Sequence, residues 1–273
     1  PPQVRALLDA RADPAVAVKF ETPVRRGGQD KLWKFDCSAA FIAAQRGRAE
    51  VLAMVLAAGD DVDRLCKCGT GGDDLSTCLL IAAEEGHVAC VRALLEAGAK
   101  VDLGDEVTGA TPLYGGCSYG HHEVGLALIA AGAAVDKART DDGATPLYTA
   151  CFNGHLEVAR VLIARGADVD EARTDNGATP LYAACGQGHP EVARALIAAG
   201  AEVDKATTDN GATPLYTACL NGHLEVARAL TAAGADVDKA RTDAGAPPLY
   251  TACLDGHPEL PLPLTPARAA LDR

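Results

Sequence analysis

Residues 143–170 read GATPLYTACFNGHLEVARVLIARGADVD, and this stretch decides the fold. Thr145 can cap a helix, and Pro146 suits the first helical position, where no backbone N–H group is needed. Apolar residues then recur at helical spacing on one face, at Leu147, Ala150 and Cys151. The pattern predicts a helix of about nine residues, which Gly154 ends by adopting a left-handed conformation.

A second helix follows this glycine. Glu157 lies in its first turn, where the helix dipole favours an anion. Its apolar face consists of Val158, Val161 and Leu162, and Gly166 ends it. The polar residues that come next predict an extended arm with a turn. Each unit is therefore a helix, a turn, a second helix and an arm, and neither helix can bury its apolar face without a neighbouring unit.

The same unit recurs along the chain at a constant step. Thr-Pro-Leu-Tyr begins at Thr111, Thr145, Thr179 and Thr213, and the differences 145 − 111, 179 − 145 and 213 − 179 are all equal to 34. A variant copy begins one step later at Pro247, and a degenerate copy begins one step before Thr111, at Thr77. An insertion of about five residues falls in the Gly-rich stretch 66–74. Similarity at a fixed period predicts a stacked array of helix pairs.

The recurring motifs are GATPLY, then GHLEVAR, then GADVD, in fixed order and at fixed spacing. They resemble the ankyrin repeat over about residues 36–257, and a stray second helix at residues 4–12 extends the match. The resemblance implies an all-α solenoid of helix-turn-helix units with extended arms or short β-hairpin loops. Two features differ from the family: the period is longer by one than the usual value of about 33, and Tyr follows Thr-Pro-Leu in place of His.

The two ends depart from the repeat. Residues 1–35 are expected to hold a partial repeat and an irregular insertion that is longer than an ordinary arm, before the array of residues 36–257. Residues 258–273 are expected to form a Pro-rich degenerate cap or tail, because proline inside a helix costs about 3 kcal/mol. The chain begins at Pro1 in mid-unit and without an initiator methionine, so we expect a processed or truncated piece.

Composition excludes several classes of partner. The formal net charge is −12, which disfavours binding to nucleic acid and to anionic membrane surfaces. No apolar run reaches the roughly 18–20 residues that span a bilayer, so no direct membrane insertion is expected. Protein partners are the remaining expectation, and the chain could be part of a larger complex.

Five of the ten cysteines recur on the apolar face of the first helix: Cys117, Cys151, Cys185, Cys219 and Cys253. Stacked helices lie about 8–10 Å apart, whereas a disulfide needs Cα atoms within about 7 Å, so this ladder predicts small core residues. Free thiols indicate a reducing, intracellular compartment, the cytoplasm or the nucleus first, with an organelle also open because the N-terminus is expected to be incomplete. Cys66 and Cys68 leave three alternatives open: a zinc site, a redox pair or a plain loop.

The histidines give no sign of catalysis. Six of them follow a glycine at the start of the second helix, which predicts a structural hydrogen bond to backbone at the turn: His87, His121, His155, His189, His223 and His257. The Gly-rich stretches lack the ending of a phosphate-binding loop, and no nucleophile elbow is present. We therefore expect no enzyme, no cofactor and no catalytic or metal-ligating residue.

Positions that differ between near-identical units indicate where a partner binds. The resemblance to ankyrin repeats places contacts at the end of the first helix and in the arms. The candidate residues are Tyr119, Arg139, Asp142, Phe152, Asn153, Arg173, Asn176, Gln187, Asn210, Leu220 and Asn221. The predicted function is a protein-interaction module or scaffold that binds a partner through its concave face. The alternatives are a structural or linker subunit held by its irregular ends and, third, a metal or thiol site at Cys66 and Cys68.

Overall fold

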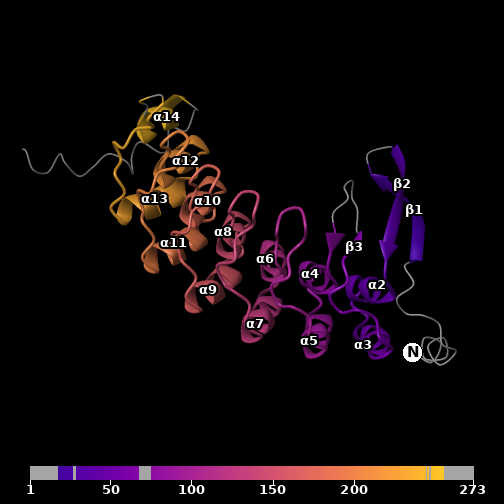
Figure 1. Cartoon of the computed structure of the whole chain (residues 1–273). Helices are drawn as coiled ribbons and strands as arrows, with labels where there is room; N and C mark the ends of the chain where they lie inside the picture. Colours follow the sequence, from indigo (N-terminus) through magenta and orange to yellow (C-terminus); the bar gives the residue numbers. More distant parts are fainter. Residues whose placement is uncertain (1–17, 27–28, 68–74, 244, 246, 255–273) are drawn as a thin grey trace, which may run out of the picture. The chain divides into compact units, whose positions relative to one another are not determined.

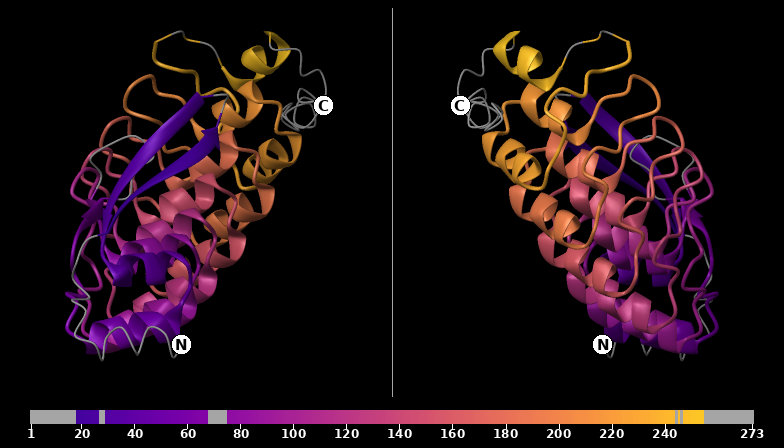
Figure 2. Two further views of the ribbon diagram at one scale, coloured as in Figure 1. Left: turned by 90° about the vertical axis from the view of Figure 1, so that its right-hand side faces the viewer. Right: turned by 90° about the vertical axis from the view of Figure 1, so that its left-hand side faces the viewer.

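The computed structural model describes the chain except for residues 1–17, 27–28, 68–74, 244, 246 and 255–273 (Figure 1). It divides into two compact units, Pro1–Asp141 and Asp142–Arg273. In each unit the helices come in antiparallel pairs, with the first helices in one row and the second helices in another (Figures 1 and 2). The predicted stack of helix pairs is confirmed, with little strand in the described residues.

The described part of the first unit contains a hairpin followed by three helix pairs. Its elements are β1 (Val18–Arg26), β2 (Gln29–Cys37), α2 (Ala39–Gln45), α3 (Ala49–Ala57), β3 (Cys66–Lys67), β4 (Leu75–Ser76), α4 (Cys78–Glu84), α5 (Val88–Glu96), α6 (Pro112–Ser118) and α7 (His122–Ala130). The strands form one antiparallel sheet in the order β1-β2-β3-β4.

Within its described residues, the second unit has three helix pairs and one further helix. Its elements are α8 (Pro146–Phe152), α9 (Leu156–Ala164), α10 (Pro180–Gly186), α11 (Pro190–Ala198), α12 (Pro214–Leu220), α13 (Leu224–Ala232) and α14 (Pro248–Leu254). Each first helix packs on the next, as α8 does on α10, and successive arms are joined by backbone hydrogen bonds. One of these runs from Thr208 N to Asn176 O at 2.8 Å.

The ends of the first helices follow from capping. The Thr145 hydroxyl accepts a hydrogen bond from Tyr148 N at 3.1 Å, and proline occupies the first turn. The helix is shorter than predicted: α8 has seven residues and ends at Phe152. The reason is that Asn153 caps it, and Gly154 then turns the chain with φ of +75°.

The core is built from small and aliphatic side chains. Leu181 and Leu196 are 0% exposed, and the described ladder cysteines Cys117, Cys151, Cys185 and Cys219 are fully buried and are not in disulfides. The prediction that this cysteine position belongs to the core is confirmed. Tight packing around a thiol-sized side chain explains why one residue type recurs there.

The N-terminal insertion differs from the prediction of irregular chain. Backbone pairing of Val18 with Cys37 through Arg26 with Gln29 makes an antiparallel hairpin of nine-residue strands. Pro23 obscured the strand in the sequence, yet proline is tolerated here because β1 is at the edge of the sheet. The helix predicted at residues 4–12, the tail at 258–273 and Cys68 lie outside the described residues.

Candidate functional site

Large side chains are exposed at the ends of the first helices. Phe152 ends α8 and Leu220 ends α12, with 42% and 39% of each residue exposed. The same position on the intervening α10 is Gly186, which has no side chain. Tyr119, which caps α6 in the first unit, is 61% exposed. Tyr119, Phe152 and Leu220 are therefore exposed, and their contact with a partner stays a prediction.

Phe152 is held in place by its own helix. Its ring stacks on that of Tyr148 with centroids 6.4 Å apart. Asn153 donates from Nδ2 to Thr149 O at 3.0 Å, so the adjoining candidate also has a fixed orientation. An ordered aromatic ring loses little conformational entropy on binding, which favours its use as an anchor.

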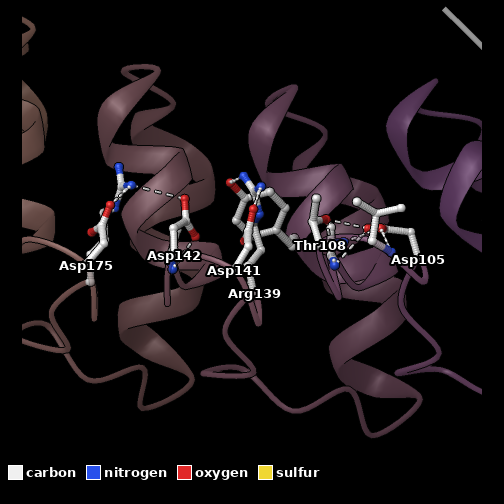
Figure 3. A network of polar contacts seen from close by, with 11 residues as sticks. Asp105, Thr108, Arg139, Asp141, Asp142 and Asp175 are labelled. Carbon is white, nitrogen blue, oxygen red and sulfur yellow. Dashed lines mark hydrogen bonds and ion pairs between the residues drawn. The ribbon is translucent and has the colours of Figure 1, made fainter. Parts of the chain in front are cut away.

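The arms carry a repeated arginine stack. Arg173 lies over the ring of Tyr148, with its guanidinium carbon 5.4 Å from the centroid, and pairs with Asp142 and Asp175 at 3.2 Å and 2.6 Å. Figure 3 labels these two carboxylates, Asp142 and Asp175. In the first unit Arg139 lies over Tyr114 in the same way and pairs with Asp141. Cation–π contact thus accounts for Tyr114 and Tyr148, the tyrosines that follow Thr-Pro-Leu in these two repeats.

The remaining polar candidates also have contacts inside the array. Asn176 Oδ1 accepts from Ala178 N, and Asn210 Oδ1 accepts from Ala212 N, both at 2.9 Å. Asn221 donates from Nδ2 to Gly186 O in the preceding repeat at 2.9 Å. Gln187 is exposed. Asn176, Asn210 and Asn221 thus help to shape the repeats, and a role in partner binding stays a prediction for these three residues and for Gln187.

A pair of acidic residues occupies the anchor position in the degenerate copy. Glu84 ends α4, and Glu85 caps it. With Tyr119 and His121 they line an open surface pocket of about 370 Å³. These two residues were not among the candidates predicted from sequence. They could have been found by aligning the repeats, because they precede Gly86 as Tyr119 precedes Gly120.

Glu84 carries a perturbed carboxyl group. Burial raises its pKa from the ordinary 4.5 to about 7, with further contributions from the charges of Glu85 and Asp105. Gly115 makes the burial possible, because a Cβ at this position would lie 2.8 Å from Glu84 Cγ. The equivalent residues in later repeats, such as Thr149 and Ala183, all carry a side chain.

The pKa of Glu84 leads to a stability prediction. Between pH 4.5 and about 7 the folded state keeps a proton that the unfolded chain releases, so stability falls as pH rises through this window. Glu84→Gln removes this loss and is expected to raise Tm at pH 8 by about 2 °C, with no gain at pH 4. Thermal melts across pH 4–8 measure it, and exposed Glu123→Gln is the control. An equal gain at both pH values would contradict the assignment.

The repeated histidines bond backbone, as predicted, but in the neighbouring repeat. His189 donates from Nε2 to Phe152 O at 3.1 Å, and His223 donates to Gly186 O at 3.1 Å. In the first unit His121 reaches Glu84 O at 2.9 Å. The acceptor is thus the end of the preceding first helix and not the turn that contains the histidine. The bond joins neighbouring repeats.

The third alternative from the sequence concerned Cys66 and Cys68. Cys66 is buried on β3. Within the described part of the chain, no three His, Cys, Asp or Glu side chains are grouped so that they could hold a metal ion. Over the same residues, no helix combines the length and apolar character needed to cross a bilayer.

Comparisons with known proteins agree with this architecture. The human ASB11 ankyrin repeat domain superposes with a TM-score of 0.72 and 31% sequence identity, over 84% of this chain and 96% of that one. A probable E3 ubiquitin-protein ligase, XBOS31 of Oryza sativa subsp. japonica, is 38% identical over 86 residues. This match spans 32% of the chain but only 18% of the rice protein.

The family model for ankyrin repeats (3 copies) matches in six overlapping windows: residues 4–105, 40–139, 100–172, 127–207, 170–241 and 201–264. These windows extend over most of the sequence and cover every helix pair described above. The chain belongs to the ankyrin-repeat family.

Proposed function

We propose that this protein binds a partner protein through the exposed residues at the ends of its first helices. Ankyrin repeats act as protein-interaction modules, and the observation that supports this surface is the exposure of Phe152 and Leu220 on either side of Gly186. Exposed aromatic and large apolar side chains carry much of the energy of an interface. An apolar side chain of the partner would lie over Gly186, where the repeat offers no side chain of its own.

The role proposed is that of a scaffold without chemistry of its own. The ligase activity named for the rice relative is not carried over, because the match covers 18% of that protein. A reducing compartment is part of the proposal, since buried ladder cysteines such as Cys117 and Cys185 are reduced.

A structural subunit is the second candidate, favoured by one observation at the last described helix. Tyr250 on α14 is 55% exposed, whereas Tyr148 and Tyr216 at the same position are 8% and 5% exposed. An arginine of the following arm covers each of these two rings, Arg173 and Arg241 respectively. A neighbouring subunit packed on α14 would bury Tyr250, and Tyr250→Ala is then expected to disrupt assembly while leaving helix-end binding intact.

The binding surface is tested by Phe152→Ala combined with Leu220→Ala. We expect affinity for the partner to fall at least about tenfold, because each truncation removes an anchor worth about 1 kcal/mol or more. Tm should change little, since both residues are about 40% exposed in the repeat array. Quantitative capture with mass spectrometry identifies the partner, and titration of that partner measures the loss.

Leu156→Ala combined with Leu224→Ala is the matched control. These residues occupy α9 and α13 of the same two repeats and are half-buried, and Pro190 shows that the position tolerates other side chains. The control should bind as the unaltered protein does. Equal losses in both double variants, or a large fall in Tm for the first, would reject the helix ends as the binding surface.

A further inference from the structure

The strongest unassigned feature lies where the N-terminal hairpin meets the first described helix pair. Strands β2 and β3 are antiparallel, and Asp36 is the Cα partner of Lys67. In this register the next pair is Cys37, the last residue of β2, opposite Cys66, the first residue of β3. Directly opposite residues have Cα atoms about 4.5–5.5 Å apart and side chains on the same face of the sheet. A disulfide requires Cα separations of about 4.4–6.8 Å.

The two thiols are already in contact. A hydrogen bond joins the Cys37 and Cys66 side chains, and both residues are buried, with exposures of 2% and 0%. Ser38 N also donates to Cys66 Sγ at 3.4 Å. The pair is therefore positioned by both strands and by the residue that caps α2.

The surroundings of Cys66 favour its thiolate. The hydrogen bond with Cys37 is the largest influence and lowers the pKa of Cys66 to about 7, together with the Ser38 backbone and the charge of Arg64, against the opposing effect of burial. Burial raises the pKa of Cys78 and Cys117. Near neutral pH, Cys66 is thus a better nucleophile than these two core thiols.

We propose that Cys37 and Cys66 form a redox-active pair that closes to an intramolecular disulfide when the protein meets hydrogen peroxide. The Cys66 thiolate attacks one peroxide oxygen, which breaks the O–O bond, gives a sulfenic acid and releases hydroxide, which is protonated to water. The sulfur of Cys37 then attacks the sulfenic sulfur, forms the S–S bond, and expels a second hydroxide, which takes the Cys37 proton. Two thiols are oxidised by two electrons, and one peroxide is reduced to two waters.

Oxidation depends on local opening, because neither sulfur faces solvent. Strand β3 has two residues and its pairing with β2 is short, so its opening costs less than opening the helices that bury Cys117 or Cys151. The pair should therefore react more slowly than an exposed thiol and faster than the ladder cysteines.

The disulfide would enclose the first described helix pair. Cys37 precedes α2 and Cys66 follows α3, so the bond closes a loop between positions 29 residues apart (66 − 37). Closing a loop of this length restricts the unfolded chain, and Tm should rise by about 5 °C or more. Unfolding of α2 and α3 should slow accordingly.

The test treats the whole chain with hydrogen peroxide at pH 7.4, blocks remaining thiols by alkylation, and maps disulfides by mass spectrometry of peptides under non-reducing conditions. We expect a Cys37–Cys66 cross-link that dithiothreitol reverses, before any ladder cysteine is modified. Tm is measured on the same samples, oxidised and reduced.

Variants distinguish the pair from its sequence neighbour. Cys37→Ala and Cys66→Ala should each abolish both the cross-link and the oxidation-dependent rise in Tm, whereas Cys68→Ser and Cys78→Ser should retain both. Comparing each variant with its own reduced form removes any change in basal stability. A Cys66–Cys68 link that persists in Cys37→Ala would overturn the proposal, and so would oxidation of the ladder cysteines while Cys37 and Cys66 remain reduced.

Discussion

Replacing Leu181 with alanine is expected to lower the free energy of unfolding by about 2–5 kcal/mol, the range for a large-to-small change in a packed core. Leu181 lies on α10, is 0% exposed, and belongs to a helix that packs on both α8 and α12. The truncation therefore leaves a cavity at the centre of the second unit and weakens contacts with two neighbouring helices. In a repeat array, stability is roughly the sum of the stabilities of single repeats and of nearest-neighbour contacts, so both contributions fall.

Urea denaturation followed by helical circular dichroism measures this effect. Leu220→Ala is the control, because the same change at a residue that is 39% exposed leaves no enclosed cavity. Its cost should stay within about 1 kcal/mol. Similar costs for the two variants would mean that Leu181 is not a core residue.

Gly154→Ala is expected to destabilise the second unit more than Gly166→Ala. Both glycines have left-handed backbone, with φ of +75° and +85°, so each alanine should cost about 1–2 kcal/mol in strain. At Gly166 nothing lies within 4 Å of the added Cβ. At Gly154 the Cβ would lie 2.6 Å from the ring of His189, which must move and give up its bond to Phe152 O. Losing this hydrogen bond should add about 1 kcal/mol to the destabilisation caused by Gly154→Ala.

A double-mutant cycle separates the two causes. In a His189→Ala background the ring is absent, and Gly154→Ala should then cost the same as Gly166→Ala. Denaturant titrations of the four proteins and of the Gly166→Ala control give the coupling energy. A coupling energy near zero would show that the imidazole of His189 is not the reason why alanine is unfavourable at Gly154.

The repeat could be predicted from sequence because the residues that start and end each helix recur in successive repeats. Thr145 and Pro146 define a helix start wherever they occur, and Gly154 defines the turn after it. The hairpin was missed because Pro23 suppresses a strand prediction, whereas the edge of a sheet tolerates it. Pairing with distant segments is not encoded in any local pattern.

The same limit applies to the sites. Exposed side chains such as Phe152 could be located from sequence because neighbouring repeats differ there, and this comparison requires no knowledge of contacts. The polar candidates were harder: Asn221 stands at an equally variable position, yet it bonds Gly186 O in the preceding repeat. The sequence suggested Cys68, two residues away, as the partner of Cys66. The side chain that contacts Cys66 is that of Cys37, because the register of β2 and β3 places these two residues opposite each other.

The histidine bonds have a consequence for how such a chain can change its length. Each described link follows one rule, in which a histidine donates to the carbonyl at the end of the preceding first helix, as His223 does to Gly186. A tandem duplication of one whole repeat would add one histidine donor and one carbonyl acceptor. The same hydrogen bond could then form at both junctions between the new repeat and its neighbours. Copies can therefore be gained or deleted in the gene without any compensating substitution, and the near-identity of the repeats within residues 143–243 is the outcome expected of that process.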